Sequence, residues 1–263
     1  MPTTRSAAFD WFNAVSGLWL IAGLFSDLGW HMRQDVDSFL TPAHAMLYSG
    51  LLLLIVGTVA YRVRAGMLPP GYELAPLGLG LFFAGGVLDF INHALWGFES
   101  GFLALLSPTH LVIGVGILIL LAGPIRSALA VPPAPTLRGQ LPAVLALASI
   151  LELLHWATNF IFLAGAEMQL APYFDKQMTP DTLTEITIAY YKQAQGVMAF
   201  LLQSLLMVGS ALYMLRVATL RQAQGDTRSA QGDTSLKPGA FTILFVLGNS
   251  FIALGESTSW AQA

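Results

Sequence analysis

The sequence predicts an all-α polytopic transmembrane helical bundle of about seven spans, formed as a single domain over residues 1–263. Of the 263 residues 55% are hydrophobic and only 10% are charged, and the mean hydropathy is +0.65. An ordinary soluble domain has roughly 25% charged residues. Long apolar stretches recur without the short alternating segments that mark a β-barrel, so helices are the expected spanning elements.

A helix needs about 20 largely apolar residues to cross the hydrocarbon core of a bilayer. By that measure the chain offers spans at residues 12–32, 43–63, 74–94, 109–126, 141–164, 194–215 and 240–260. The Pro-containing segments 67–71 and 131–135 are expected to be connections on the inner side. The polar segment 217–238, which contains a repeated Gln-Gly-Asp-Thr, is expected to be a flexible loop before the last span.

The positions of Arg and Lys predict the orientation. If the N-terminus is cytoplasmic, nine basic residues lie on the inner side and three on the outer side, which fits the positive-inside rule. No small-residue cleavage site follows the first apolar stretch, so we expect it to be retained as a span. The expected location is therefore a bacterial-type inner (plasma) membrane, with the N-terminus inside and the lipid bilayer as surroundings.

Charge and cysteine content exclude several function classes. A formal net charge of -3 is too small to suggest nucleic-acid binding. The chain has no cysteine, which excludes disulfides, thiolate zinc sites, covalent c-type haem and cysteine-ligated iron–sulfur clusters. A bound metal ion would have to be held by nitrogen and oxygen atoms.

Two matching sets of Asp and His are the candidate metal ligands. The first has the spacing Asp-x3-His-x12-His and the second Asp-x3-His-x16-His, and four of the five histidines of the chain belong to them. Each set ends in a Ser/Thr-Pro-x-His corner, and its first two positions recur after 62 residues. The sets are Asp27, His31 and His44 in a first hairpin (27–44) and Asp89, His93 and His110 in a second hairpin (89–110).

Helix geometry explains why this spacing suits a metal ion. Residues four apart lie on one face of a helix, so the Asp and the first His of each set can reach the same ion. A helix that starts at the Pro of the corner returns the second His to the same depth. Two imidazoles and one carboxylate suit Cu(II), Zn(II) or Fe(II). An Asp–His pair that only braces helix ends is the alternative, but buried charged groups in a bilayer usually mark function.

A third polar patch is expected in the fifth span. Glu152, His155 and Asn159 follow at i, i+3 and i+7, so Glu152 and His155 share a helix face. A polar clamp between helices explains them without further function. The alternative is that they support the metal ligands, relay protons or supply an extra ligand.

The two hairpins also carry a family resemblance. Residues 27–44, with Asp27-Leu28-Gly29-Trp30-His31 and Thr41-Pro42-Ala43-His44, resemble the copper-binding segment of the C subunit of particulate methane and ammonia monooxygenases. Residues 89–110 resemble that family's second ligand hairpin, although Asp89 stands where the family has an amide and the loop is longer. The resemblance implies copper as the cofactor, with zinc or iron as alternatives from the ligand types.

These observations together predict an integral membrane copper-binding protein. In an enzymatic version, copper activates O2 and oxidises a small apolar substrate, with other membrane subunits or a homo-oligomer as partners. Non-catalytic binding, delivery or sensing of copper or zinc is one alternative. A b-type haem protein with His31/His93 or His44/His110 as axial pairs is another, although the Asp residues weigh against it. One dinuclear site and two mononuclear sites both remain open at this stage.

Overall fold

A computed structural model describes residues 5–31, 41–97, 107–131 and 136–157, with short pieces between residues 197 and 247. Its main helices are α1 (Ala7–His31), α2 (Pro42–Ala65), α3 (Ala75–Trp96), α5 (Pro108–Leu121), α6 (Gly123–Ala130) and α7 (Leu137–Ala157). The described residues contain no strand. The predicted all-α class is thus confirmed.

Five helical segments are long and apolar enough to cross a membrane. They are Ala7–Asp27, Pro42–Ala65, Ala75–Trp96, Pro108–Ala130 and Leu137–Leu154. They correspond to the first five spans expected from the sequence. The sixth, at 194–215, is described only in helical pieces shorter than a span, the seventh, at 240–260, falls largely outside the described residues, and the polar loop 217–238 lies wholly outside them. The count of seven therefore stays a prediction.

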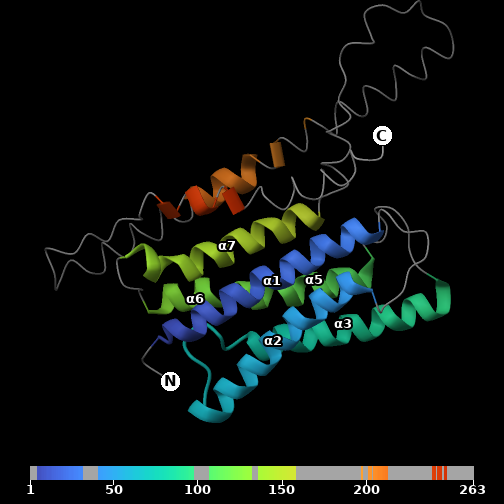
Figure 1. Ribbon diagram of the computed structural model, residues 1–263, viewed down its shortest axis with the longest axis horizontal. Helices are drawn as coiled ribbons and strands as arrows, with labels where there is room; N and C mark the ends of the chain where they lie inside the picture. Colours follow the sequence, from blue (N-terminus) through green and yellow to red (C-terminus); the bar gives the residue numbers. More distant parts are fainter. Residues whose placement is uncertain are drawn as a thin grey trace, which may run out of the picture.

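The bundle contains two helical hairpins, and α7 packs against helices of both. Figure 1 shows α1 beside α2 and α3 beside α5, with α7 running along α1. Glycines allow the backbones of each pair to approach closely, as is common in membrane helices. A Cβ at Gly23 of α1 would lie 2.6 Å from the backbone of Leu47, and one at Gly116 of α5 would lie 2.7 Å from that of Phe82.

The first helix begins five residues earlier than the apolar stretch that the sequence indicated. It starts at Ala7 and includes Asp10, whose side chain is 0% exposed. This carboxylate forms an ion pair with Arg5 and accepts a hydrogen bond from the hydroxyl of Tyr72 at 2.8 Å. Because its charge is neutralised and hydrogen-bonded, Asp10 can be buried within the helix at tolerable cost.

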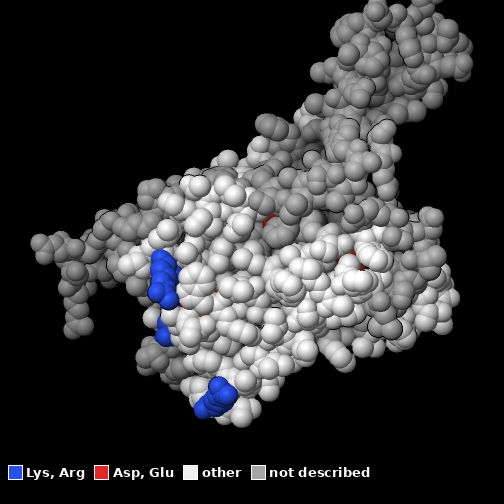
Figure 2. Space-filling view, in the orientation of Figure 1, with Lys and Arg blue, Asp and Glu red and all other residues white. Residues whose placement is uncertain are grey.

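The basic side chains of the described residues lie at the end of the bundle where the N-terminus is found. Figure 2 shows Lys and Arg side chains gathered at that end. The chain places basic residues near the start of α1, at the end of α2, within α6 and near the start of α7. They are Arg5, Arg62, Arg64, Arg126 and Arg138. Alternate helix directions bring them together, and both histidine hairpins close at the opposite end.

Gly116→Ala should destabilise the bundle by about 1–3 kcal/mol, because its Cβ would press on the backbone of α3 and force the helices apart. Gly80→Ala is the matched control on α3, since a Cβ there meets nothing within 4 Å. It should be neutral or stabilise by about 0.5–1 kcal/mol. Thermal unfolding in detergent measures both, and equal midpoints for the two variants would contradict the proposed role of the close glycine contact.

Tyr72 should make the fold sensitive to alkali. Burial, and then the charge and hydrogen bond of Asp10, raise the pKa of Tyr72 above its ordinary value. The stabilisation from the protonated phenol is therefore complete below about pH 10, where an unfolded tyrosine ionises, and declines as the pH rises further. Tyr72→Phe should be less stable at neutral pH by about 1–3 kcal/mol, because Asp10 loses a donor.

Melting curves of the wild type and Tyr72→Phe from neutral to strongly alkaline pH test this prediction. The difference between the two proteins should shrink above about pH 10. A difference that stays constant across the range would show that Tyr72 contributes no pH dependence.

Candidate metal centre

The second hairpin brings its three predicted ligands together. Asp89 and His93 lie one turn apart on α3, and His110 lies in the first turn of α5. Nε2 of His93 is 3.3 Å from Oδ2 of Asp89, and Nε2 of His110 is 3.7 Å from Oδ1. One ligand atom from each of the three residues lies within 4.8 Å of the others. Asp89 is only 6% exposed.

These separations match the size of a small metal site. Ligand atoms at about 2.1 Å from a tetrahedral ion are roughly 3.4 Å from one another. The two Asp89–His separations lie close to that value, one to each oxygen of the carboxylate. Two imidazoles and a carboxylate also leave coordination positions for water or another molecule.

The Ser-Pro-x-His corner fixes the orientation of His110. The hydroxyl of Ser107 caps α5 by accepting a hydrogen bond from the backbone N–H of His110 at 3.3 Å. The same oxygen lies 2.8 Å from Nδ1 of the His110 ring. Pro108 suits the first helical position, which has no backbone partner for an N–H. The start of α5 and the orientation of the ring are thus set by one hydroxyl group, which leaves Nε2 directed at Asp89.

The ring of His93 faces Asp89 through Nε2 and is held through its other nitrogen, Nδ1. Its Nδ1 lies 3.2 Å from the carbonyl oxygen of Gly97, which can only accept a hydrogen bond. Nδ1 therefore carries the proton, and in the neutral ring Nε2 presents a lone pair to the Asp89 carboxylate. Two electron-pair donors at 3.3 Å repel each other unless a cation lies between them. A metal ion would satisfy this arrangement.

The backbone conformation at position 97 favours a glycine. Gly97 ends α3 with φ +82°, in the region that favours glycine, and its N–H bonds to the carbonyl of His93. The glycine cap therefore places the carbonyl oxygen of Gly97 next to Nδ1 of the His93 ring.

Thr109 is a site residue that sequence reasoning missed. Its hydroxyl donates a hydrogen bond of 2.7 Å to Oδ1 of Asp89, the oxygen that also faces His110. Thr109 is the variable residue of the Ser-Pro-x-His corner, and the first hairpin has Ala43 there. A hydroxyl beside a predicted ligand was the available signal, but only the packing of α5 against α3 shows which carboxylate it reaches.

In the first hairpin the structure brings two of the three predicted ligands together. Nδ1 of His44 lies 3.4 Å from Oδ1 of Asp27 and 2.9 Å from the hydroxyl of Thr41, which caps α2. His44 also stacks on Tyr48, with ring centroids 5.6 Å apart. His31 is the last residue of α1, and its side chain lies outside the described part of the chain. The structure thus places Asp27 and His44 side by side, and the role of all three residues of the first set as ligands stays a prediction.

The third polar patch is described only at Glu152. This side chain is 0% exposed within α7 and does not join the Asp89–His93–His110 group. The side chain of His155 and the whole of Asn159 lie outside the described residues. Their predicted supporting role stays a prediction.

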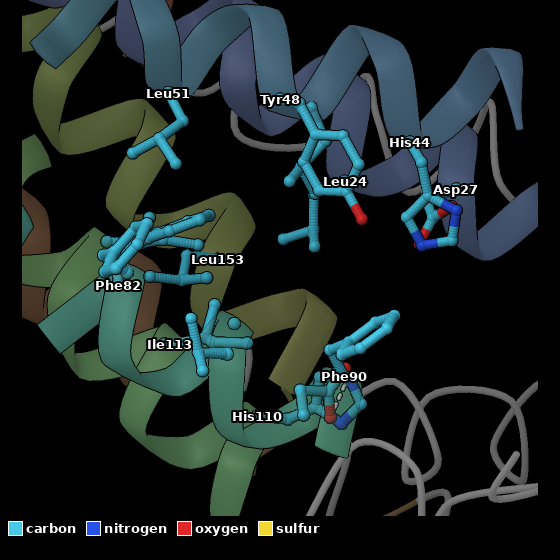
Figure 3. A pocket seen from close by; sticks show the side chains of 17 residues that line it. Leu24, Asp27, His44, Tyr48, Leu51, Phe82, Phe90, His110, Ile113 and Leu153 are labelled. Atoms are coloured by element: carbon cyan, nitrogen blue, oxygen red, sulfur yellow. Dashed lines mark ion pairs between the residues drawn. The ribbon is translucent and has the colours of Figure 1, made fainter. Parts of the chain in front are cut away.

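A cavity of about 420 Å³ connects the two hairpins. Asp27 and His44 border it from α1 and α2, and Asp89 and His110 border it from α3 and α5. Figure 3 shows these two walls facing each other, with the phenol of Tyr48 projecting between them. Most of the remaining lining is aliphatic or aromatic. Two candidate ligands from each hairpin, Asp27 and His44 and Asp89 and His110, therefore face the same largely apolar chamber.

Comparisons with protein families, with curated proteins and with solved structures find no match to this chain. The assignment of the site thus rests on its own geometry.

Ser107→Ala should weaken metal binding at the second hairpin by about 10–100-fold, because outer partners of a ligating histidine usually contribute that much. It should also lower helix stability by about 1 kcal/mol through loss of the cap. Ser107→Thr is the matched control, since the first corner uses Thr41 for the same two contacts. Titration with Zn(II) or Cu(II) measures the affinities. Equal affinities for the Ala and Thr variants would contradict the role assigned to the hydroxyl.

Proposed function

We propose that this membrane protein binds a transition-metal ion through Asp89, His93 and His110. The observation that carries the proposal is the convergence of the three side chains with Nδ1 of both rings held by the chain. Such outer contacts are typical of histidines that ligate metals, because they fix the tautomer and the direction of Nε2. A buried carboxylate facing an imidazole lone pair also favours a cation at this point.

The first hairpin is proposed to hold a second ion through Asp27, His44 and His31. Its contacts differ from those of the second hairpin, because His44 turns Nδ1 toward the carboxylate whereas His110 turns Nε2. Ions at the two positions would share one cavity. They would have different geometries, so we expect them to differ in affinity and exchange rate.

Copper is the metal that the family resemblance favours, and two His with one carboxylate accommodate it. When bound, it would supply redox chemistry toward O2, and the apolar chamber would limit access of water. Zinc would fit the same ligands in a delivery or sensing protein. The convergence of His93 and His110 on one carboxylate supports an ion over haem, whose proposed axial pairs take one histidine from each hairpin.

The orientation follows from the positive-inside rule. The end of the bundle with the described arginines would face the cytoplasm, and the metal centre would lie near the outer face. Accessibility labelling of cysteines introduced beside Arg62 and beside Gly97 would check this orientation.

Metal analysis of the protein purified from its native membrane tests the proposed centre. His93→Ala and His110→Ala should each remove about one ion per chain, because a three-ligand site rarely retains its metal with two. His44→Ala is the matched control, since it alters the other hairpin and should leave this ion in place. An electronic spectrum of the same samples identifies copper or haem.

Unchanged metal content in both His93→Ala and His110→Ala would refute the proposed centre. Loss of all metal in His44→Ala as well would show that the two hairpins form a single interdependent site.

A further inference from the structure

The cavity between the hairpins is polar at one end and apolar at the other. At the closed end of the hairpins its wall carries Asp27, His44, Asp89 and His110. One to two turns deeper, toward the middle of the bundle, it carries Leu51, Phe82, Ile117 and Leu153. Figure 3 shows the same separation, with Asp27, His44 and His110 on one side of the view and Leu51, Phe82 and Leu153 on the other. A chamber with this polarity matches an amphiphilic molecule.

Two glycines leave the space between these ends open. Gly86 of α3 and Gly114 of α5 both line the cavity, and a Cβ added at either meets nothing within 4 Å. They contrast with Gly85 and Gly116 on the same helices, where a Cβ would strike the partner helix at 2.7 Å. Close helix packing therefore explains Gly85 and Gly116, whereas Gly86 and Gly114 provide room.

The cavity also has a side open to lipid. Phe83 and Phe90 of α3 line it while being 67% and 56% exposed. Helices α2 and α3 form its two long walls but are not among the closely packed pairs of the bundle. In a bilayer, exposed aromatic side chains of this kind contact hydrocarbon rather than water. A molecule dissolved in the membrane can therefore enter between α2 and α3.

We propose that the cavity binds one single-chain amphiphile from the bilayer, with a neutral oxygen head group at the metal and its chain directed toward the middle of the membrane. The position of the head group rests on the proposed metal centre. A methylene group is about as large as a water molecule, which takes about 30 Å³, so the cavity has room for a chain of roughly ten to fourteen carbons. Pockets of this size usually bury most of a small ligand.

Charge decides the kind of head group. Asp27 and Asp89 already place two carboxylates at the polar end, and a divalent ion at the Asp89 centre alone, with the first hairpin empty, would about balance them; the preference for a neutral head group applies to this state. An anionic head group would leave excess negative charge in a low-dielectric region, which is strongly unfavourable. An alcohol is therefore preferred to a fatty acid of the same length. An alkane would fill the chain site without the polar contact.

The probe is 1-dodecanol with a photoreactive diazirine near its chain end, crosslinked to the full-length protein in lipid nanodiscs and mapped by peptide mass spectrometry. We expect crosslinks at the apolar end, on Leu51, Phe82 or Leu153. Unlabelled 1-dodecanol should compete at about tenfold lower concentration than dodecanoate or dodecane.

Glycine variants decide whether the crosslinks come from the cavity. Gly86→Leu and Gly114→Leu fill the open space and should reduce labelling by about tenfold or more, since overfilled cavities exclude ligands. Gly80→Leu is the matched control on α3, because its Cβ is equally unobstructed and it does not line the cavity. It should label like the wild type. All three replacements favour the helix, so folding is expected to be retained.

Labelling of Gly86→Leu and Gly114→Leu at the wild-type level would overturn the proposal, as would labelling spread evenly over lipid-facing positions such as Leu52 and Val63. Metal analysis of the same samples separates the two proposals. Metal-loaded protein without cavity crosslinks would refute the chain site alone. Crosslinked protein without metal would refute the metal centre and its contact with the head group, and would retain the chain site.

Discussion

A carboxylate inside the hydrocarbon region must be neutralised where it lies, and much of this structure follows from that constraint. Asp10 meets it with the charge of Arg5 and the hydroxyl of Tyr72, whereas Asp89 accepts a hydrogen bond from Thr109 and faces two imidazoles that could hold a neutralising cation with it. Each arrangement joins elements that are distant in the sequence, because no single helix carries enough partners for its own charged group. The polar groups therefore fix how helices meet at both ends of the bundle.

Glycine contacts complement these polar clusters between the two ends. Membrane helices gain little from hydrophobic burial against each other, so close backbone packing has to supply much of their association. Gly23 and Gly50 serve α1 and α2, and Gly116 serves α3 and α5. The two hairpins are tight within themselves and looser toward each other. This difference leaves the apolar chamber between them.

The class of fold and the grouping of Asp89, His93 and His110 could be predicted from the sequence because each depends on local patterns. Hydropathy and span length indicated the helices, and the Asp-x3-His spacing together with the Pro corner indicated the ligands. The start of α1 was misjudged, because the burial of Asp10 depends on Tyr72, 62 positions away. The contact of Thr109 with Asp89 and the cavity between the hairpins likewise depend on tertiary packing. No periodicity in the sequence reports either of them.

The hydroxyl groups of the two Ser/Thr-Pro-x-His corners couple the start of a helix to the positioning of a candidate ligand. Thr41 and Ser107 each end a loop, start a helix and hold the imidazole three residues later. A histidine fixed in this way loses its rotational freedom when the helix forms, before any ion arrives. Binding of an ion would then require little further ordering of the histidine side chain. Its conformational entropy is lost earlier, when the helix forms during membrane insertion. For His110, whose Nε2 is aimed at Asp89 by this contact, the proposed centre would offer a ready-made ligand to an incoming ion, and its occupancy would be governed by metal supply rather than by a conformational change.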